Sequence, residues 1–204
     1  MQDSYFNILG SERTVEIQFV IEKMNQLSNE NNNLKMLDIG GVPSTASEFQ
    51  PVIDSIISNK INYKVADFRG GDYVGDFVTI DIPEQFDACM FLSSLEHFPQ
   101  CTEGDMQYRD KEDVKGFKKS LSILKDNGYV ILTVPFGEYI WQPYHQNYDY
   151  NGLLELTKGS SIKEQYFYRL EGGEWLLTKD YQTLENIRYT DRCYAVACLL
   201  LQKQ

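Results

Sequence analysis

Short apolar runs in this sequence end in glycines and carboxylates, which are residues that can bind a ligand. The first run, residues 34–39, contains Asp38 and is followed by Gly40 and Gly41. Glycine adopts positive φ angles and lets a ligand approach the backbone, and a helix N-terminus after such a turn would offer unpaired N–H groups and a partial positive charge. In an open α/β sheet, ligands bind at the carboxyl ends of the strands. The segment therefore predicts either a ligand site or an ordinary turn between a strand and a loop.

Polar residues follow three later apolar runs in the same way. Asp67 ends the next run, Asp76 follows a two-residue run and Gly75, and Ser93 follows the fourth run. If these runs are neighbouring parallel strands, their carboxyl ends meet at one edge of the sheet. We therefore expect the two carboxylates to face the same site.

The pattern of apolar residues predicts the elements that must position these side chains. Apolar residues recur at helical spacing in residues 11–27 and 111–125, and Pro51 stands where a helix can begin. The expected helices are residues 11–27, 51–58, 111–125 and 152–157, and the expected strands are residues 34–39, 62–67, 73–74, 86–92, 129–134, 162–170 and 193–201. With the turn 126–128 ending the third helix, this alternation predicts one α/β domain, in which a parallel sheet has helices on both faces and two late antiparallel strands at one edge.

The composition excludes several classes of partner. The net charge is −11, and this negative field disfavours nucleic acid and anionic membrane surfaces. No apolar stretch is long enough to span a membrane. The four cysteines show no C-x-x-C spacing, which suits a reducing compartment. We therefore expect a cytoplasmic protein that does not act on nucleic acid or on membranes.

The acidic residues before the third expected helix do not predict a metal site. They are Asp105, Asp110, Glu112 and Asp113. Acids gather at helix starts because they interact favourably with the helix dipole. No metal ligand set is therefore assigned.

The order of the motifs resembles that of a known family. The segments LDIGG, KVADF, GDF, FDACMFLSSLEHF and LKDNGYVILTVPFG follow one another within residues 34–137. This series is similar to class I S-adenosyl-L-methionine-dependent methyltransferases, especially their bacterial small-molecule branch. The resemblance implies a Rossmann-like, doubly wound fold with a mostly parallel seven-stranded sheet and an antiparallel C-terminal strand. Residues 1–33 would then form an N-terminal helical segment, residues 34–137 the cofactor-binding core, and residues 138–204 a substrate-side loop and the C-terminal strands.

The resemblance also implies which residues contact S-adenosyl-L-methionine. Those residues are Asp38, Gly40, Gly41, Asp67, Asp76, Phe77 and Ser93. Asp67 would accept hydrogen bonds from both ribose hydroxyls, and Asp76 would hold the adenine amino group while the Phe77 backbone contacts the ring. The glycines would admit the methionine portion, and Ser93 would lie near its amino acid end.

One part of the glycine-rich turn departs from the family pattern. Val42 and Ser44 stand where the family has further glycines, with Pro43 between them. A side chain at Val42 would crowd a cofactor lying on the turn, so either the loop takes another path or the protein is a non-catalytic binding or assembly protein that kept the fold. The same residues disfavour a dinucleotide cofactor, whose turn must approach a pyrophosphate closely. A different transfer from the same cofactor type, such as aminopropyl transfer, stays open.

Candidate catalytic residues follow the fourth and fifth expected strands. Methyl transfer to a hydroxyl benefits from a general base, and the chain's two histidines, His97 and His145, both lie there. We predict His97 as the base and His145 as the second candidate or a substrate ligand. Weaker candidates for orienting the substrate are Glu96, Tyr144, Tyr148 and Asp149, and Arg13 and Glu16 could reach over the cofactor.

The acceptor implied by the resemblance is an oxygen of a sugar or another secondary metabolite. The aromatic-rich residues 136–150 fit a substrate-side loop, and they are equally compatible with internal packing or a homodimer contact.

Overall fold

The computed structural model describes residues 11–41, 47–100, 111–142, 145–188 and 192–204. Within these ranges, none of the helices combines the length and apolar character needed to cross a membrane. Val42, Pro43 and Ser44 of the glycine-rich turn lie outside the described residues, as do Cys101, Asp105, Asp110 and Tyr144.

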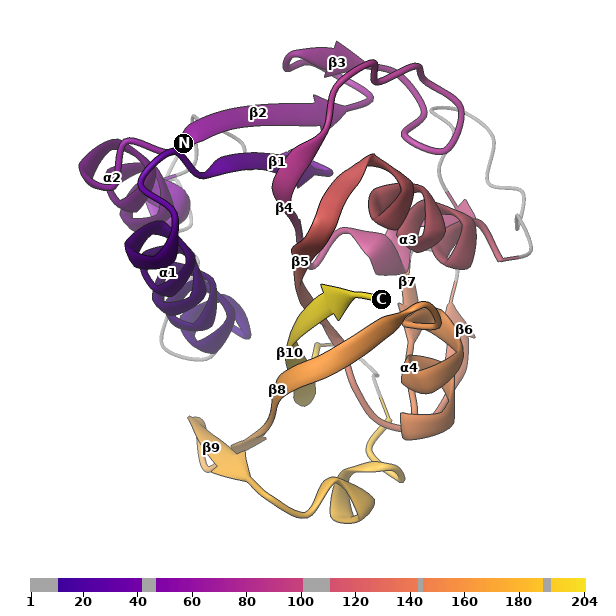
Figure 1. Ribbon diagram of the computed structural model, residues 1–204. Coiled ribbons are helices and arrows are strands. Elements are labelled where there is room, and N and C mark those ends of the chain that lie inside the picture. Colours follow the sequence, from indigo (N-terminus) through magenta and orange to yellow (C-terminus); the bar gives the residue numbers. More distant parts are fainter. Residues whose placement is uncertain (1–10, 42–46, 101–110, 143–144, 189–191) are drawn as a thin grey trace, which may run out of the picture.

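An eight-stranded mixed sheet forms the centre of the molecule (Figure 1). Its strands, in spatial order, are β3 (Tyr73–Val74), β2 (Asn62–Asp67), β1 (Lys35–Ile39), β4 (Phe86–Leu92), β5 (Leu124–Pro135), β10 (Ala195–Lys203), β8 (Ser160–Glu171) and β9 (Glu174–Thr178). The strands from β3 to β5 run parallel, and β10, β8 and β9 each pair antiparallel with their neighbours. The doubly wound α/β prediction is confirmed. The additional strand is β9, which returns along β8 after the turn at Gly172 and Gly173.

Helices cover both faces of the sheet (Figure 1). One face carries α1 (Arg13–Glu30) and α2 (Gln50–Ser58), and the other carries α3 (Glu112–Ile123) and α4 (Tyr150–Leu156). Three short helical turns, η1 (Ser47–Phe49), η2 (Leu95–Gln100) and η3 (Tyr181–Leu184), and a hairpin of β6 (Ile140–Gln142) and β7 (His145–Asn147) complete the described elements. The hairpin was not predicted, because its aromatic and amide residues lack a clear alternation.

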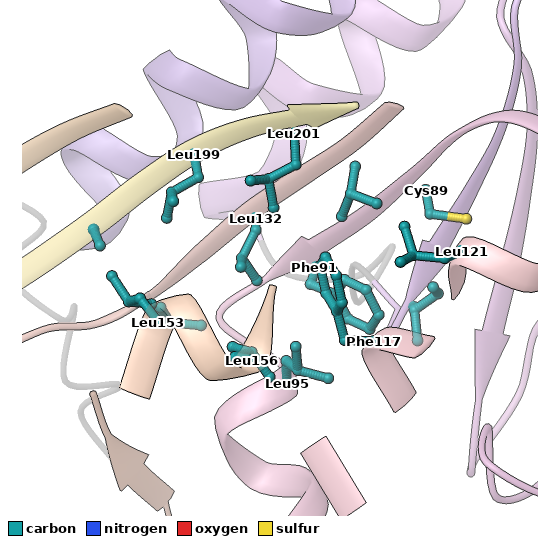
Figure 2. Packing of buried hydrophobic residues seen from close by; sticks show 14 of the residues in the cluster. Cys89, Phe91, Leu95, Phe117, Leu121, Leu132, Leu153, Leu156, Leu199 and Leu201 are labelled. Carbon is teal, nitrogen blue, oxygen red and sulfur yellow. The ribbon is translucent and has the colours of Figure 1, made fainter. Parts of the chain in front are cut away.

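Side chains of the sheet alternate between two hydrophobic clusters, as the two-residue period of a strand requires. Leu37 and Ile39 of β1 pack on the α3 and α4 side, whereas Met36 packs on the α1 and α2 side. Figure 2 shows part of the first cluster, in which sheet residues such as Phe91 and Leu132 face side chains of α3 and α4. The sheet edge where β1, β2 and β4 end thereby lies between two packed layers of helices.

The boundary between α3 and β5 differs from the prediction. Residues 126–128 were expected to separate the helix from the strand, but β5 already begins at Leu124, which is fully buried and pairs with Phe86. The register shifts between Phe86 and Ala88, so that residues 125–128 form an irregular segment opposite Asp87. Burial of Leu124 extends the strand across a sequence that locally favours a turn.

Candidate functional site

Neighbouring side chains lie very close to the backbone of the glycine turn after β1. Gly40 has φ +89° and its N–H donates to the Ala66 carbonyl at 2.9 Å, which ties the end of β1 to β2. A Cβ atom on Gly40 would lie 2.3 Å from the Cβ atom of Ser94. Gly41 has φ +47°, and its Cβ position lies 3.3 Å from the Cβ atom of Asp67. Both glycines are therefore needed for the path of this turn.

Replacing Gly40 by alanine should destabilise the protein strongly. The added methyl group would both collide with Ser94 and hold alanine at a positive φ, and we expect a loss of about 2–4 kcal/mol in unfolding free energy. Urea denaturation followed by circular dichroism measures this loss. Gly173→Ala is the matched control, because Gly173 has φ +88° with no atom within 4 Å of its Cβ position. Equal losses in the two variants would show that contact with Ser94 is unimportant.

A hollow opens at the carboxyl ends of β1, β2 and β3. It encloses about 350 Å³ when the open space at its mouth is included. Its lining consists of Gly40, Ala66, Asp67, Phe68, Gly75, Asp76, Phe77, Val78, Phe98 and Glu112. Both carboxylates predicted from strand ends, one glycine of the turn and Phe77 thus lie around one space.

Backbone contacts orient the two carboxylates of the hollow. One carboxylate oxygen of Asp67 accepts from the Arg69 N–H at 2.8 Å, and one of Asp76 accepts from the Val78 N–H at 3.0 Å. The Asp67 carbonyl also accepts from the Gly75 N–H at 3.1 Å, which links the two turns. These bonds hold the two acids at the rim of the hollow, and a carboxylate has up to about four acceptor positions.

Aromatic residues form the apolar part of the hollow. The Phe77 ring is buried and meets Phe91 and Phe98 edge to face, with centroids 6.2 and 6.1 Å away. Phe68 is 41% exposed at the lining. A ring in this position offers a flat apolar surface to a planar ligand. Sequence reasoning missed Phe68, although its place directly after Asp67 was a usable signal, and it also missed Val78, Phe98 and the lining role of Glu112.

Three other residues predicted to contact the cofactor, Asp38, Gly41 and Ser93, do not line the hollow. Asp38 is buried on the sheet face toward α1 and α2, where it accepts a hydrogen bond from the Tyr63 hydroxyl. Burial, followed by the charge of Asp38, raises the pKa of Tyr63. Gly41 lies against Asp67 beside the hollow. Asp38 and Gly41 are not among the residues that line it.

Ser93 lies under the N-terminal helix. Its φ is +42°, and its N–H donates to the Thr133 hydroxyl at 3.0 Å. The Ser93 hydroxyl donates to Glu16, a fully buried residue that also accepts from Arg13 at 2.7 Å. Burial raises the pKa of Glu16. In this structure Ser93 therefore joins β4 to α1.

Glu96 and His97 occupy η2, directly beyond β4. The Glu96 side chain is 3% exposed, and its Oε2 atom has no hydrogen-bond partner among the described residues. Burial raises the pKa of Glu96 to about 7. His97 Nε2 lies 3.9 Å from Glu96 Oε1, and the His97 side chain is 44% exposed. The pair thus places an imidazole at the surface over a buried carboxylate.

The remaining candidates are mostly structural. The buried Tyr148 hydroxyl donates to Asp113 at 2.8 Å, and the side-chain amide of Gln146 donates to the same carboxylate at 3.2 Å. Asp149 caps α4 by accepting from the Gly152 N–H at 2.6 Å. His145 belongs to β7 and pairs with Gln142, but its side chain is not among the side chains that the structure describes. No group of three or more potential metal ligands occurs within the described part of the chain.

Solved structures with a similar fold span nearly the whole chain. The MccD protein has a TM-score of 0.58 at 9% identity, with 91% of this chain and 96% of that chain covered. An S-adenosylmethionine-dependent methyltransferase from Clostridium acetobutylicum ATCC 824 has a TM-score of 0.51 at 15% identity, with 92% and 90% covered. The N-methyltransferase NodS from Bradyrhizobium japonicum WM9, in complex with S-adenosyl-L-homocysteine, has a TM-score of 0.50 at 9% identity, with 99% and 93% covered.

These comparisons establish the fold class. No protein-family model and no curated protein matches the sequence. The chain has the Rossmann-like fold of class I S-adenosyl-L-methionine-dependent methyltransferases, as the sequence resemblance implied.

Proposed function

We propose that this protein is an S-adenosyl-L-methionine-dependent methyltransferase that acts on a small molecule. The observation that carries the proposal is the hollow in which Asp67 and Asp76 lie with Gly40 and Phe77. These residues were assigned to one cofactor from a sequence resemblance alone. Their meeting around a single space, at the carboxyl ends of parallel strands, is the arrangement that a nucleoside site requires.

The residues of the hollow fit the parts of that cofactor. Asp67 has acceptor capacity for the two ribose hydroxyls, and Asp76 can accept a hydrogen bond from the adenine amino group. Phe68 would pack against the adenine face. Asp38, Gly41 and Ser93 do not line the hollow, and their contact with the cofactor stays a prediction. When bound, the cofactor supplies a sulfonium-activated methyl group.

Isothermal titration with S-adenosyl-L-homocysteine tests this proposal. We expect saturable binding at one site per chain, with a rise in melting temperature because the ligand binds only the folded state. An absence of both signals would reject the cofactor and favour the alternative of a non-catalytic protein with a degenerate glycine-rich turn.

His97 is the proposed general base for an oxygen acceptor, as in a sugar or another secondary metabolite. Its partly exposed imidazole lies in the same turn as Phe98, which lines the hollow. A base at this place could take the acceptor's proton as the methyl group is transferred. His145 is kept as the second candidate, or as a substrate ligand, on its position in β7.

Replacing His97 by alanine should slow methyl transfer without weakening cofactor binding. A general base contributes on the order of 10²- to 10⁴-fold to the rate. The measurement is transfer of radiolabelled methyl from S-adenosyl-L-methionine to a panel of sugars and phenols, with S-adenosyl-L-homocysteine affinity measured in parallel. Full activity in the variant would remove His97 from the role of base.

A further inference from the structure

Strand β9 leaves one side of the eight-stranded sheet open (Figure 1). It pairs with β8 on one side, and no other described strand pairs with its second side. The edge strand at the other end of the sheet, β3, has two residues, whereas β9 has five. Edge strands usually avoid pairing with other chains through charges, prolines or a very short length. With the sequence EWLLT, β9 contains no proline and one charged residue, so its edge can accept another strand.

The turn between β8 and β9 determines which backbone groups point to the open side. Its two glycines, at 172–173, have φ +61° and +88°, as in a two-residue type I′ turn, and the residues that flank the turn pair with each other. Such a closing pair exchanges both of its hydrogen bonds, and hydrogen-bonded pairs then recur at every second residue. The N–H and C=O groups of Leu176 therefore point to β8, while those of Trp175 and Leu177 point to the open side.

Apolar side chains are exposed on both faces of β9. Leu176 is 44% exposed and Leu177 is 54% exposed. They point to opposite faces of the sheet, because side chains alternate along a strand. Trp175 is on the same face as Leu177 and packs against the hydrophobic cluster of α1 and α2. A strand added at the open side would therefore cover apolar surface on both faces.

A second copy of β9 fits this edge when a two-fold axis passes through Leu176. In a symmetric antiparallel pair, each contact between two residues occurs twice, once from each chain. With the axis at Leu176, this residue lies opposite its own copy, and Trp175 of each chain lies opposite Leu177 of the other. The outward N–H and C=O groups of Trp175 and Leu177 then meet as hydrogen-bonded pairs. Apolar side chains thus face apolar side chains on both faces of the pair.

The two neighbouring registers fit less well. An axis at Leu177 would place Glu174 opposite Asp180, and like charges directly opposite each other destabilise a sheet. An axis at Trp175 would leave Leu177 opposite a glycine, which offers no side chain for packing. The register centred on Leu176 avoids both problems.

We propose that the protein forms a homodimer in which β9 pairs antiparallel with β9 of a second copy, with the two-fold axis at Leu176. The two eight-stranded sheets then form one continuous sheet. The hollow proposed for the cofactor lies at the carboxyl ends of β1, β2 and β3, toward the other end of the sheet, so the pairing leaves both hollows accessible. The dimer is therefore independent of the proposed function.

Sedimentation equilibrium over chain concentrations from micromolar to millimolar tests the dimer. We expect a mass that rises with concentration from 23.7 kDa toward twice this value, because one pair of strands buries a small area and forms a weak interface. Raising the ionic strength should strengthen association, because it screens the repulsion between two chains of net charge −11. A monomer at every concentration would overturn the proposal.

Two matched substitutions test whether β9 forms the interface. Leu176→Lys would place two like charges opposite each other at the axis and should weaken association on the order of tenfold or more. Leu154→Lys is the control, because Leu154 is also 44% exposed but belongs to α4, and it should leave association unchanged. Circular dichroism verifies that both variants are folded. Equal association of Leu176→Lys and the unaltered protein, or equal weakening by both substitutions, would overturn the assignment to β9.

A cysteine at the axis tests the register. The Cα atoms of a non-hydrogen-bonded antiparallel pair are about 4.5 Å apart, which a disulfide can span. Leu176→Cys should therefore form a disulfide with its own copy under mild oxidation, beyond any cross-linking of the four native cysteines in the unaltered protein. Leu177→Cys would lie opposite Trp175 and should not cross-link. Cross-linking of Leu177→Cys to the same extent as Leu176→Cys would overturn the register.

Discussion

Replacing Asp67 by alanine should abolish most of the affinity for S-adenosyl-L-homocysteine. The carboxylate is held at the rim of the hollow by the Arg69 N–H, and it is the proposed acceptor for two ribose hydroxyls. Hydrogen bonds to a charged group contribute about 1.5–3 kcal/mol each, so losing both should weaken binding on the order of 10²-fold or more. Isothermal titration of the two proteins measures this ratio.

A control variant separates a local effect from a change in overall charge. Asp54 lies exposed on α2, on the face that carries α1, and its carboxylate contacts only Gln50 among the hydrogen bonds described here. Asp54→Ala should bind the ligand as tightly as the unaltered protein. Equal affinities of Asp67→Ala and the unaltered protein would refute the role of Asp67.

Replacing Glu96 by glutamine should stabilise the protein at neutral and alkaline pH. Burial raises the pKa of Glu96 from 4.5 to about 7, so the folded state binds more protons than the unfolded state between these values. Stability is therefore expected to fall as the pH rises from about 4.5 to 7, and the full cost is present above pH 7. A shift of this size corresponds to about 3 kcal/mol, and the variant should recover a large part of it at pH 8.

Chemical denaturation of the two proteins at pH 5 and pH 8 measures the effect. A loss of stability in Glu96→Gln at pH 8 would contradict this expectation and would show that the ionised carboxylate has a stabilising partner.

The strands and most helices were predictable because their sequences satisfy local rules. The apolar runs of β2, β3 and β4 begin and end at the predicted residues. Asp67 and Asp76 could be placed together because parallel neighbours end at one edge of a sheet. The extension of β5 back to Leu124 could not be predicted, because it depends on pairing with Phe86 far away in the sequence.

The parts of the site that escaped prediction depend on contacts between distant residues. Ser93 was assigned to the cofactor, yet its hydroxyl bonds to Glu16, which lies 77 positions earlier in the chain. Glu96 was ranked below His97 because histidine is the usual base near neutral pH, and only the folded structure shows that Glu96 is buried without a partner for one oxygen. The sequence therefore indicated where the site lies, whereas the burial of Glu96 could be seen only in the folded structure.

The crystal structure of the protein grown with S-adenosyl-L-homocysteine tests the central claim most directly. We predict density for the adenosine in the hollow, with the ribose hydroxyls on the Asp67 carboxylate and the adenine beside Phe68. Crystals grown at saturating ligand that show the ligand elsewhere, or an empty hollow, would contradict the account.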